Sequence, residues 1–209
     1  MAKAIKYYVR TTGERQLDSS YSQIEYELLI DTEHNARKSF VEQLEKLAES
    51  EEHVVILEDD LILCNDFKKK MEEALKGHKT DVINFFYRPN YWFTSRYTYY
   101  FIWNQCVFYP NSILKKLSKK MRELYEQNPK TPHDELEGRA LQELGIKTWL
   151  PRPCLVQHKD EDTLIQGFTN HGRRSPYFVD YLEELGISYK KALPNRNRLI
   201  KLMNLKFKK

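Results

Sequence analysis

Residues 53–60 read HVVILEDD, so four consecutive apolar residues lead directly into three carboxylates. An uninterrupted run rich in Val and Ile is typical of a central strand that is buried on both faces of a sheet. Three neighbouring anions cannot stay in such an interior without a cation or strong hydrogen-bond donors. The run therefore predicts a buried strand that ends at a metal or phosphate-metal site.

The rest of the chain alternates between the two kinds of periodicity. Strands are expected at residues 6–10, 26–30, 54–57, 82–86 and 146–150. Helices are expected at residues 35–50, 66–76, 112–125, and from an N-cap at Thr131, with Pro132 in the first position, to Gly145. Alternating strands and helices predict an α/β sandwich with a largely parallel central sheet.

Residues 87–109 differ in composition from the rest of the chain, because they are rich in Tyr, Trp and Phe. One interpretation is a hairpin whose aromatic side chains pack a small second sheet. The other is a stacking platform for a sugar or a nucleic-acid base.

Composition describes a globular chain of one ordinary domain: 209 residues, 41% hydrophobic and 31% charged. Without a signal-like or transmembrane segment of about 20 apolar residues, the expectation is a cytoplasmic protein. Three widely spaced cysteines without a CxxC pair predict buried apolar side chains. Residues 1–190 are expected to form the domain, and residues 191–209 a basic tail that grips nucleic acid or an anionic membrane, or is simply solvated.

The acidic residues suit a divalent cation. Mg²⁺ or Mn²⁺ takes one or two protein carboxylates and completes its shell with water and phosphate oxygens. Glu58 and Asp60 are two residues apart, and so lie on the same side if the strand continues, whereas Asp59 faces the other way. A cation there would act as a Lewis acid on a departing diphosphate.

Residues 54–67, VVILEDDLILCNDF, resemble the acidic metal-binding motif of GT-A glycosyltransferases, and are similar to the lipooligosaccharide-type and phage-encoded members. Residues 103–110, WNQCVFYP, resemble the acceptor-side strand that follows in that family. Residues 133–158 are similar to its later acidic helix start, strand and terminal histidine. The resemblance implies a single-domain, Rossmann-like α/β/α sandwich with a small second sheet. Only 57 residues precede Glu58, fewer than in the nucleotide-binding half of typical members.

The resemblance also implies roles for individual residues. Asp60 and His158 would bind the metal, and Glu58 or Asp59 would hold the ribose or the metal's waters. Asp134 or Glu135 would be the catalytic base, unless both acids only complement a helix dipole. Nucleotide contacts would come from Arg10, Arg15 and Asp31, and from Arg173, Arg174 and Ser175 in a polar loop whose arginines suit phosphate, unless that loop is merely solvated.

The function expected from these residues is metal-dependent transfer of a sugar from a nucleotide-sugar donor, with a UDP-sugar favoured, to a hydroxyl acceptor with inversion. The acceptor is either a modified DNA base or a cell-surface glycan. A metal-dependent nuclease or phosphatase is one alternative, since clustered carboxylates also build two-metal sites. A non-enzymatic nucleic-acid-binding module is the other, on the basis of the basic tail and the aromatic residues.

Overall fold

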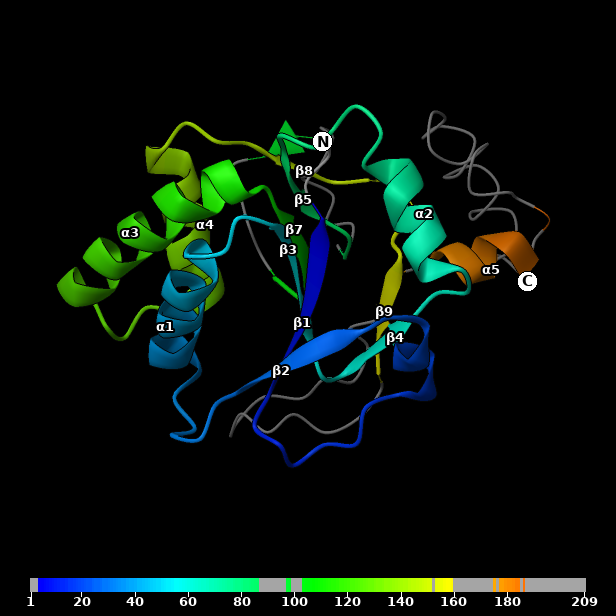
Figure 1. The fold of residues 1–209 in the computed structure, drawn as a ribbon, viewed down its shortest axis with the longest axis horizontal. Coiled ribbons are helices and arrows are strands. Elements are labelled where there is room, and N and C mark those ends of the chain that lie inside the picture. The colour runs from blue at the N-terminus through cyan, green and yellow to red at the C-terminus, as the bar shows by residue number, and fades with distance from the viewer. Residues whose placement is uncertain are drawn as a thin grey trace, which may run out of the picture.

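A mixed seven-stranded sheet forms the centre of the molecule (Figure 1). The computed structural model describes residues 4–86, 97–98, 103–151, 153–159, 175, 177–184 and 186. The strand order is β2-β1-β3-β7-β5-β8-β6, with β1 Ile5–Thr11, β2 Tyr26–Ile30, β3 His53–Glu58, β5 Val82–Asn84, β6 Tyr97–Thr98, β7 Cys106–Tyr109 and β8 Thr148–Trp149. Only β6 and β7 run against the direction of the others. The expected α/β architecture with a mostly parallel sheet is confirmed.

A second, two-stranded sheet pairs β4 Leu61–Leu63 with β9 Val156–His158 in antiparallel fashion. A small second sheet was expected, but from the aromatic stretch, and that origin is wrong. Strand β7 joins the main sheet between β3 and β5, and β6 pairs with β8 instead of with β7. All four residues of β7 are buried, which suits a central strand. Residues 87–96 and 99–102, where a stacking platform was considered, lie outside the described residues.

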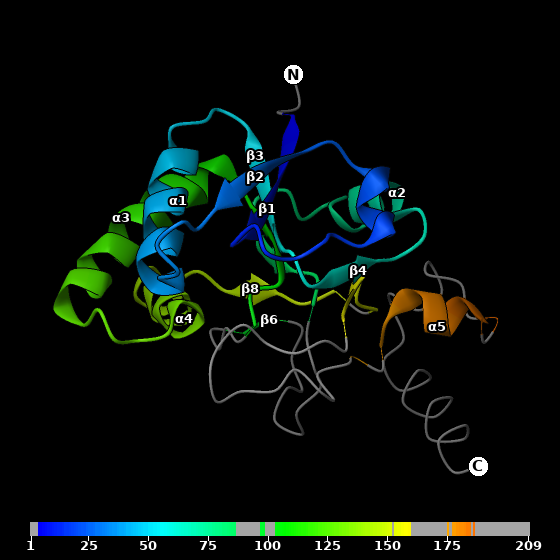
Figure 2. The same cartoon turned by 90° about the horizontal axis from the view of Figure 1, so that it is seen from below.

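Helices cover both faces of the main sheet (Figures 1 and 2). One face carries α1 Ala36–Ala48, α3 Asn111–Gln127 and α4 His133–Glu143. The opposite side carries α2 Phe67–Ala74, α5 Val179–Glu184, the short 3₁₀ helix η1 Ser19–Gln23 and the second sheet. The molecule is thus layered, with helices on either side of the sheet.

The middle of strand β3, residues 54–57, is apolar because both of its faces are covered. Val54 and Ile56 pack among the residues of α1, α3 and α4, while Val55 and Leu57 pack against the α2 side. None of the four is more than 1% exposed. Burial on two sides explains the continuous apolar run that precedes the carboxylates.

The expected helix start at Thr131 is wrong by one position. Helix α4 begins at His133, and Pro132 is the N-cap residue, with no capping side chain. Pro132, with a φ of −53° and a ψ of 144°, is not helical, so the helix starts one residue later than expected. The expected helix end is confirmed: Gly145 follows α4 with a positive φ of 69°.

One expectation from composition is also confirmed. Cys64, Cys106 and Cys154 are free and buried, as expected of small apolar side chains. In the described part of the chain, no helix is both long enough and apolar enough to cross a bilayer.

Candidate functional site

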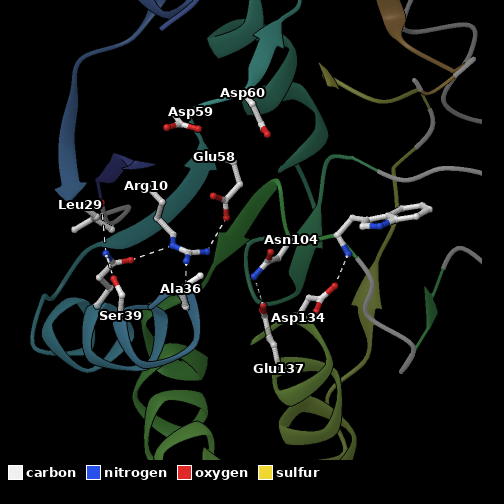
Figure 3. Close-up of polar contacts among 12 residues, drawn as sticks. Arg10, Leu29, Ala36, Ser39, Glu58, Asp59, Asp60, Asn104, Asp134 and Glu137 are labelled. Carbon is white, nitrogen blue, oxygen red and sulfur yellow. Dashed lines mark hydrogen bonds and ion pairs between the residues drawn. The ribbon is translucent and has the colours of Figure 1, made fainter. Parts of the chain in front are cut away.

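The three carboxylates of residues 58–60 lie where β3 ends and the chain turns into β4 (Figure 3). Strand β1 runs parallel to β3, with Arg10 opposite Glu58, so both strands end at the same edge of the sheet. Ligands of open α/β sheets collect at such carboxyl ends. The close-up shows Glu58 turned toward Arg10, with Asp59 and Asp60 beyond it.

Glu58 is held by Arg10, whose Nη1 donates to Oε1 over 2.6 Å. Arg10 is itself fixed, because it also donates to Gln43 Oε1 at 3.0 Å and lies over the ring of Phe40 at 4.5 Å. Burial raises the pKa of Glu58 to about 7; Arg10 opposes that shift, and the neighbouring aspartates add to it. Arg10 therefore orients Glu58 and is not placed as a free phosphate ligand.

Asp59 is satisfied within the protein. Its Oδ2 accepts a hydrogen bond from Thr11 Oγ1 at 2.7 Å, and the Thr11 hydroxyl in turn accepts from the backbone N–H of Gly13 at 2.8 Å. Arg15 Nη1 reaches Oδ1 of Asp59 at 3.4 Å. Because each oxygen of Asp59 already has a donor within the protein, Asp59 has little capacity left to bind a ligand.

Asp60 is only half satisfied. Its Oδ2 lies 2.9 Å from Arg15 Nη1 and 3.3 Å from Nε2 of His158. Its Oδ1 is buried and has no hydrogen-bond partner in the described structure. An unpaired, buried carboxylate oxygen costs free energy unless a cation or a donor supplies the missing contact.

His158 faces Asp60 because β9 pairs with β4, with His158 opposite Leu61. Its imidazole is almost fully buried, and its Nδ1 lies 2.7 Å from the carbonyl oxygen of Lys159. That carbonyl can only accept, so Nδ1 carries a hydrogen. A proton or a metal ion on Nε2 would join His158 to the Asp60 carboxylate, whose Oδ2 is 3.3 Å away.

Asp60 and His158 are a mixed pair of ligands: the carboxylate suits Mg²⁺ and Mn²⁺, whereas imidazole suits softer transition metals such as Zn²⁺ and Fe²⁺. The contact from Nδ1 to a backbone carbonyl is the usual way in which a metal-binding histidine is oriented. Over the described residues, however, no group of three or more His, Cys, Asp or Glu side chains could hold a metal ion. The protein would contribute two ligands, and water and phosphate oxygens would complete the shell.

Unpaired buried polar atoms gather at this edge of the sheet. Four occur among the described residues, on Thr12, Asp60, Gln105 and Thr148. Thr12 follows β1, Asp60 follows β3, and the carbonyl of Gln105 accepts the N–H of Glu58 at 2.9 Å. Three of the four residues that carry these atoms thus lie at the ends of β1 and β3.

Asp134 joins this edge through the segment that precedes β7. Its Oδ2 accepts from the backbone N–H of Trp103 at 3.5 Å, and Trp103 lies two residues before Gln105. The φ of Trp103 is 61°, an uncommon conformation for a bulky residue, and Asn84 Nδ2 donates to its carbonyl at 3.1 Å. Asp134 therefore sits beside a constrained backbone segment next to Glu58.

Glu135 points elsewhere. It pairs with Arg139 at 2.6 Å along the outside of α4, and both side chains are about half exposed. Of the two acids expected as a base, only Asp134 is connected to the ends of β1 and β3.

The sequence reasoning missed Glu137, which is fully buried on α4 one turn after Asp134. Its Oε1 accepts from the Tyr109 hydroxyl at 2.6 Å and its Oε2 from Asn104 Nδ2 at 3.2 Å. Burial raises the pKa of Glu137 to about 8, although both hydrogen bonds act in the opposite direction. The i, i+3 spacing from Asp134 was the available signal, since it puts both acids on one helix face.

Asp31 follows β2 at the same edge of the sheet. Its backbone N–H donates to the carbonyl of Thr11 at 2.8 Å, and its side chain accepts the N–H groups of Glu33 and Asn35 in the turn before α1. Ser175 is fully buried, and its backbone exchanges two hydrogen bonds with the Gln157 side chain. Those contacts hold Ser175 to β9 and leave its side chain no exposed surface. Arg173 and Arg174 lie outside the described residues.

Comparison with known proteins identifies no family for this chain. No protein-family model matches the chain, and no curated protein shows significant sequence similarity to it.

Proposed function

We propose that this protein is a metal-dependent glycosyltransferase of the GT-A type, which transfers a sugar from a nucleotide-sugar donor to a hydroxyl acceptor. The observation that carries the proposal is the proximity of Asp60 and His158 at the end of β3: Asp60 Oδ1 is buried without a partner, and Nε2 of His158, from β9, lies 3.3 Å from Asp60 Oδ2. Mn²⁺ or Mg²⁺ is the proposed cofactor, and a UDP-sugar is the favoured donor.

Spatial convergence supports this function over a metal site of another kind. The resemblance to GT-A enzymes rests on segments far apart in sequence: the acidic strand end, the segment before β7, the start of α4 and the late histidine. Hydrogen bonds and strand pairing connect these segments at one edge of the sheet, through Glu58 to Gln105, Trp103 to Asp134 and Leu61 to His158. A chance likeness of short motifs gives no reason for such proximity.

In the proposed reaction Asp134 accepts the proton of the acceptor hydroxyl as that oxygen attacks the anomeric carbon. The bond from the anomeric carbon to the diphosphate oxygen breaks, and its electron pair leaves with the nucleoside diphosphate. Attack from the side opposite the leaving group inverts the anomeric centre. A bound cation would supply Lewis acidity toward the diphosphate. Glu58, fixed by Arg10, would bind ribose hydroxyls or water.

The alternatives fit less well. A nuclease with two metal ions needs carboxylates beyond the two-ligand set of Asp60 and His158, and the described residues supply no larger group. A nucleic-acid-binding module gives no reason for the unpaired Asp60 oxygen. The proposed acceptor is a modified DNA base or a cell-surface glycan.

The test is turnover of a panel of nucleotide sugars with Mn²⁺, followed as release of the nucleoside diphosphate and as transfer to candidate acceptors. We expect Asp60→Asn and Asp134→Asn each to lower turnover by about 100-fold or more, the usual cost of losing a general base or a Lewis acid. Glu135→Gln is the matched control, because it removes a neighbouring carboxylate that is paired with Arg139 on the outside of α4. Its turnover should stay within about twofold of wild type.

Undiminished turnover in Asp60→Asn would remove the cation assignment. Equal losses in Asp134→Asn and Glu135→Gln would remove Asp134 as the base. A wild-type protein that neither binds nor hydrolyses any nucleotide sugar in the presence of Mn²⁺ would contradict the proposed function itself.

A further inference from the structure

Strand β2 forms a lateral edge of the main sheet (Figure 1). It pairs with β1 on one side, and its other side carries no strand of the described residues. Tyr26, Leu28 and Ile30 are 39%, 50% and 51% exposed, and within the described part of the chain they are the only large apolar side chains that are exposed to this extent. Alternate residues of a strand share a face, so these three side chains form an apolar row along the lateral edge.

The peptide groups of the same three residues face away from the sheet. The N–H of Asp31, directly after β2, donates to the carbonyl of Thr11 in β1 at 2.8 Å. Since the N–H and C=O groups of neighbouring residues point to opposite sides of a strand, those of Tyr26, Leu28 and Ile30 point outward. The lateral edge therefore offers an added strand both hydrogen-bonding groups and apolar side chains.

β2 lacks the features that usually protect an edge strand, which are Lys, Pro or a bulge. Residues 26–30 read YELLI and contain neither Lys nor Pro. Their pairing with β1 is continuous over all five residues, so no bulge twists the edge away. The edge is open to pairing with another segment.

This lateral edge is also acidic. Residues 16–36 contain five Asp or Glu and no Lys or Arg. Glu25 and Glu27 are exposed, and neither forms an ion pair with another described residue. The nearby Lys6 of β1 is already paired with Glu52 at 3.0 Å. An edge of this charge favours a cationic partner.

A second copy of the chain fits the lateral edge poorly. Antiparallel pairing of two β2 strands about Leu28 would place Glu25 of each copy opposite Asp31 of the other, and like charges directly opposite are destabilising. Three side chains that are about half exposed also offer much less than the ~800 Å² per partner of a stable protein–protein interface. A single extended segment needs less area, because main-chain hydrogen bonds supply much of its affinity.

We propose that β2 is a docking site for an extended segment of a partner protein in which apolar and basic residues alternate. The added strand extends the main sheet, with its apolar side chains against the apolar row and its Lys or Arg side chains beside Glu25 and Glu27. The alternation follows from the pleat, because the acidic and the apolar residues of β2 lie on opposite faces. None of the residues proposed for catalysis belongs to β2, so this inference is independent of the proposed function.

The test measures the binding of a synthetic peptide, KVKFKVK with blocked ends, to the full chain by calorimetric titration. Two control peptides separate its features: EVEFEVE keeps the alternation with the opposite charge, and KKVFVKK keeps the composition without the alternation. The protein variants are Leu28→Lys and Glu27→Lys. Glu126→Lys is the matched control, because it makes the same change of charge at an exposed acid of α3. Thermal melts establish that each variant is folded.

We expect KVKFKVK to bind the wild type at least about tenfold more tightly than either control peptide, since only KVKFKVK matches both the charge and the pleat. Leu28→Lys and Glu27→Lys should each weaken its binding about tenfold, because the first removes an apolar contact and both add a positive charge. Glu126→Lys should leave the affinity within about twofold of wild type.

Hydrogen exchange resolved by residue tests the mode of binding. In the complex the N–H groups of Tyr26, Leu28 and Ile30 should exchange more slowly, because the added strand accepts hydrogen bonds from them. The N–H of Leu29 already faces β1 and should change little. Binding without slower exchange at the three outward N–H groups would contradict strand addition.

Equal binding of KVKFKVK and KKVFVKK would reduce the site to a general attraction between charges and overturn the inference. Unchanged binding in Leu28→Lys, or no binding of KVKFKVK to the wild type, would also overturn it. A wild type that is dimeric in sedimentation, with a monomeric Leu28→Lys variant, would assign the lateral edge to a second copy instead.

Discussion

At the scale of single residues, the three neighbouring acids differ in how their oxygens are satisfied. Glu58 is held by Arg10, Asp59 by Thr11 and Arg15, and Asp60 by Arg15 through one oxygen, while its other oxygen has no partner. An ion pair, a set of hydrogen bonds and an unpaired acceptor give three chemically distinct carboxylates in a row. Asp60 is therefore the acid with capacity left for a ligand.

Glu137 gives a prediction for the pH dependence of stability. Its pKa is about 8 in the folded protein, against an ordinary value of 4.5. Below pH 4.5 the carboxyl is protonated in both the folded and the unfolded chain and has no linkage cost. As the pH rises toward 8, the unfolded chain releases the proton and the folded chain retains it, so the free energy of unfolding falls. Glu137→Gln cannot ionise and should escape this loss.

We expect the wild type to lose at least about 1.4 kcal/mol relative to Glu137→Gln between pH 5 and pH 8, the value of one pKa unit. Urea unfolding at several pH values measures the difference. Glu135→Gln, an exposed acid on the same helix, should follow the wild type across this range. A constant difference between wild type and Glu137→Gln would show that Glu137 is ionised at all of these pH values.

At the scale of elements, α4 contributes to the site through its first turn, while its end depends on Gly145. Asp134 and Glu137 lie on the side of α4 that faces the segment before β7, and Glu135 lies on the outside. A rotation of the helix by one residue would exchange these roles. The helix must therefore be held in register at both ends.

Gly145→Ala should destabilise the protein by about 1 kcal/mol, because an L-residue in the left-handed region carries a penalty of roughly that size. The cost is conformational alone, since no atom lies within 4 Å of an added Cβ and the φ is 69°. Gly145→Asn should lose less, as asparagine tolerates this region better. Urea unfolding compares the three proteins. Wild-type stability in Gly145→Ala would mean that the helix end rearranges.

At the scale of the whole molecule, the candidate cation site joins two sheets. Asp60 follows β3 of the main sheet, whereas His158 belongs to β9 of the second sheet. The hydrophobic clusters on the two faces of β3 fix the main sheet, and β4–β9 pairing brings the histidine to it. A cation bound by both residues would link segments that are distant in sequence.

Binding of the cation should therefore raise global stability. At a concentration of Mn²⁺ about 100 times its Kd, the free energy of unfolding should increase by about 2.7 kcal/mol, if the unfolded chain does not bind the ion. Thermal unfolding with and without Mn²⁺ measures the gain. Asp60→Asn should abolish it, while Asp66→Asn, a change at an exposed acid beyond β4, should leave it intact. An equal gain in Asp60→Asn would place the ion elsewhere.

The sequence alone determined those strands and helices whose residue pattern fits only one type of secondary structure. The apolar run of residues 54–57 needed cover on both faces, which predicted a central strand, and the acids after it predicted polar chemistry at its end. The periodicity of α1 and the glycine after α4 were equally local, since each depends on the preferences of neighbouring residues.

Only the tertiary structure decided which acids share a site and which are satisfied. β7 lies in the main sheet instead of in a separate hairpin, because pairing partners depend on the packing of the whole sheet. Asp134 and Glu135 are adjacent and chemically alike, yet the rotation of α4 directs one toward the backbone of Trp103 and the other outward. Pairing and burial act between residues far apart in the chain, so their consequences appear only when the chain is folded.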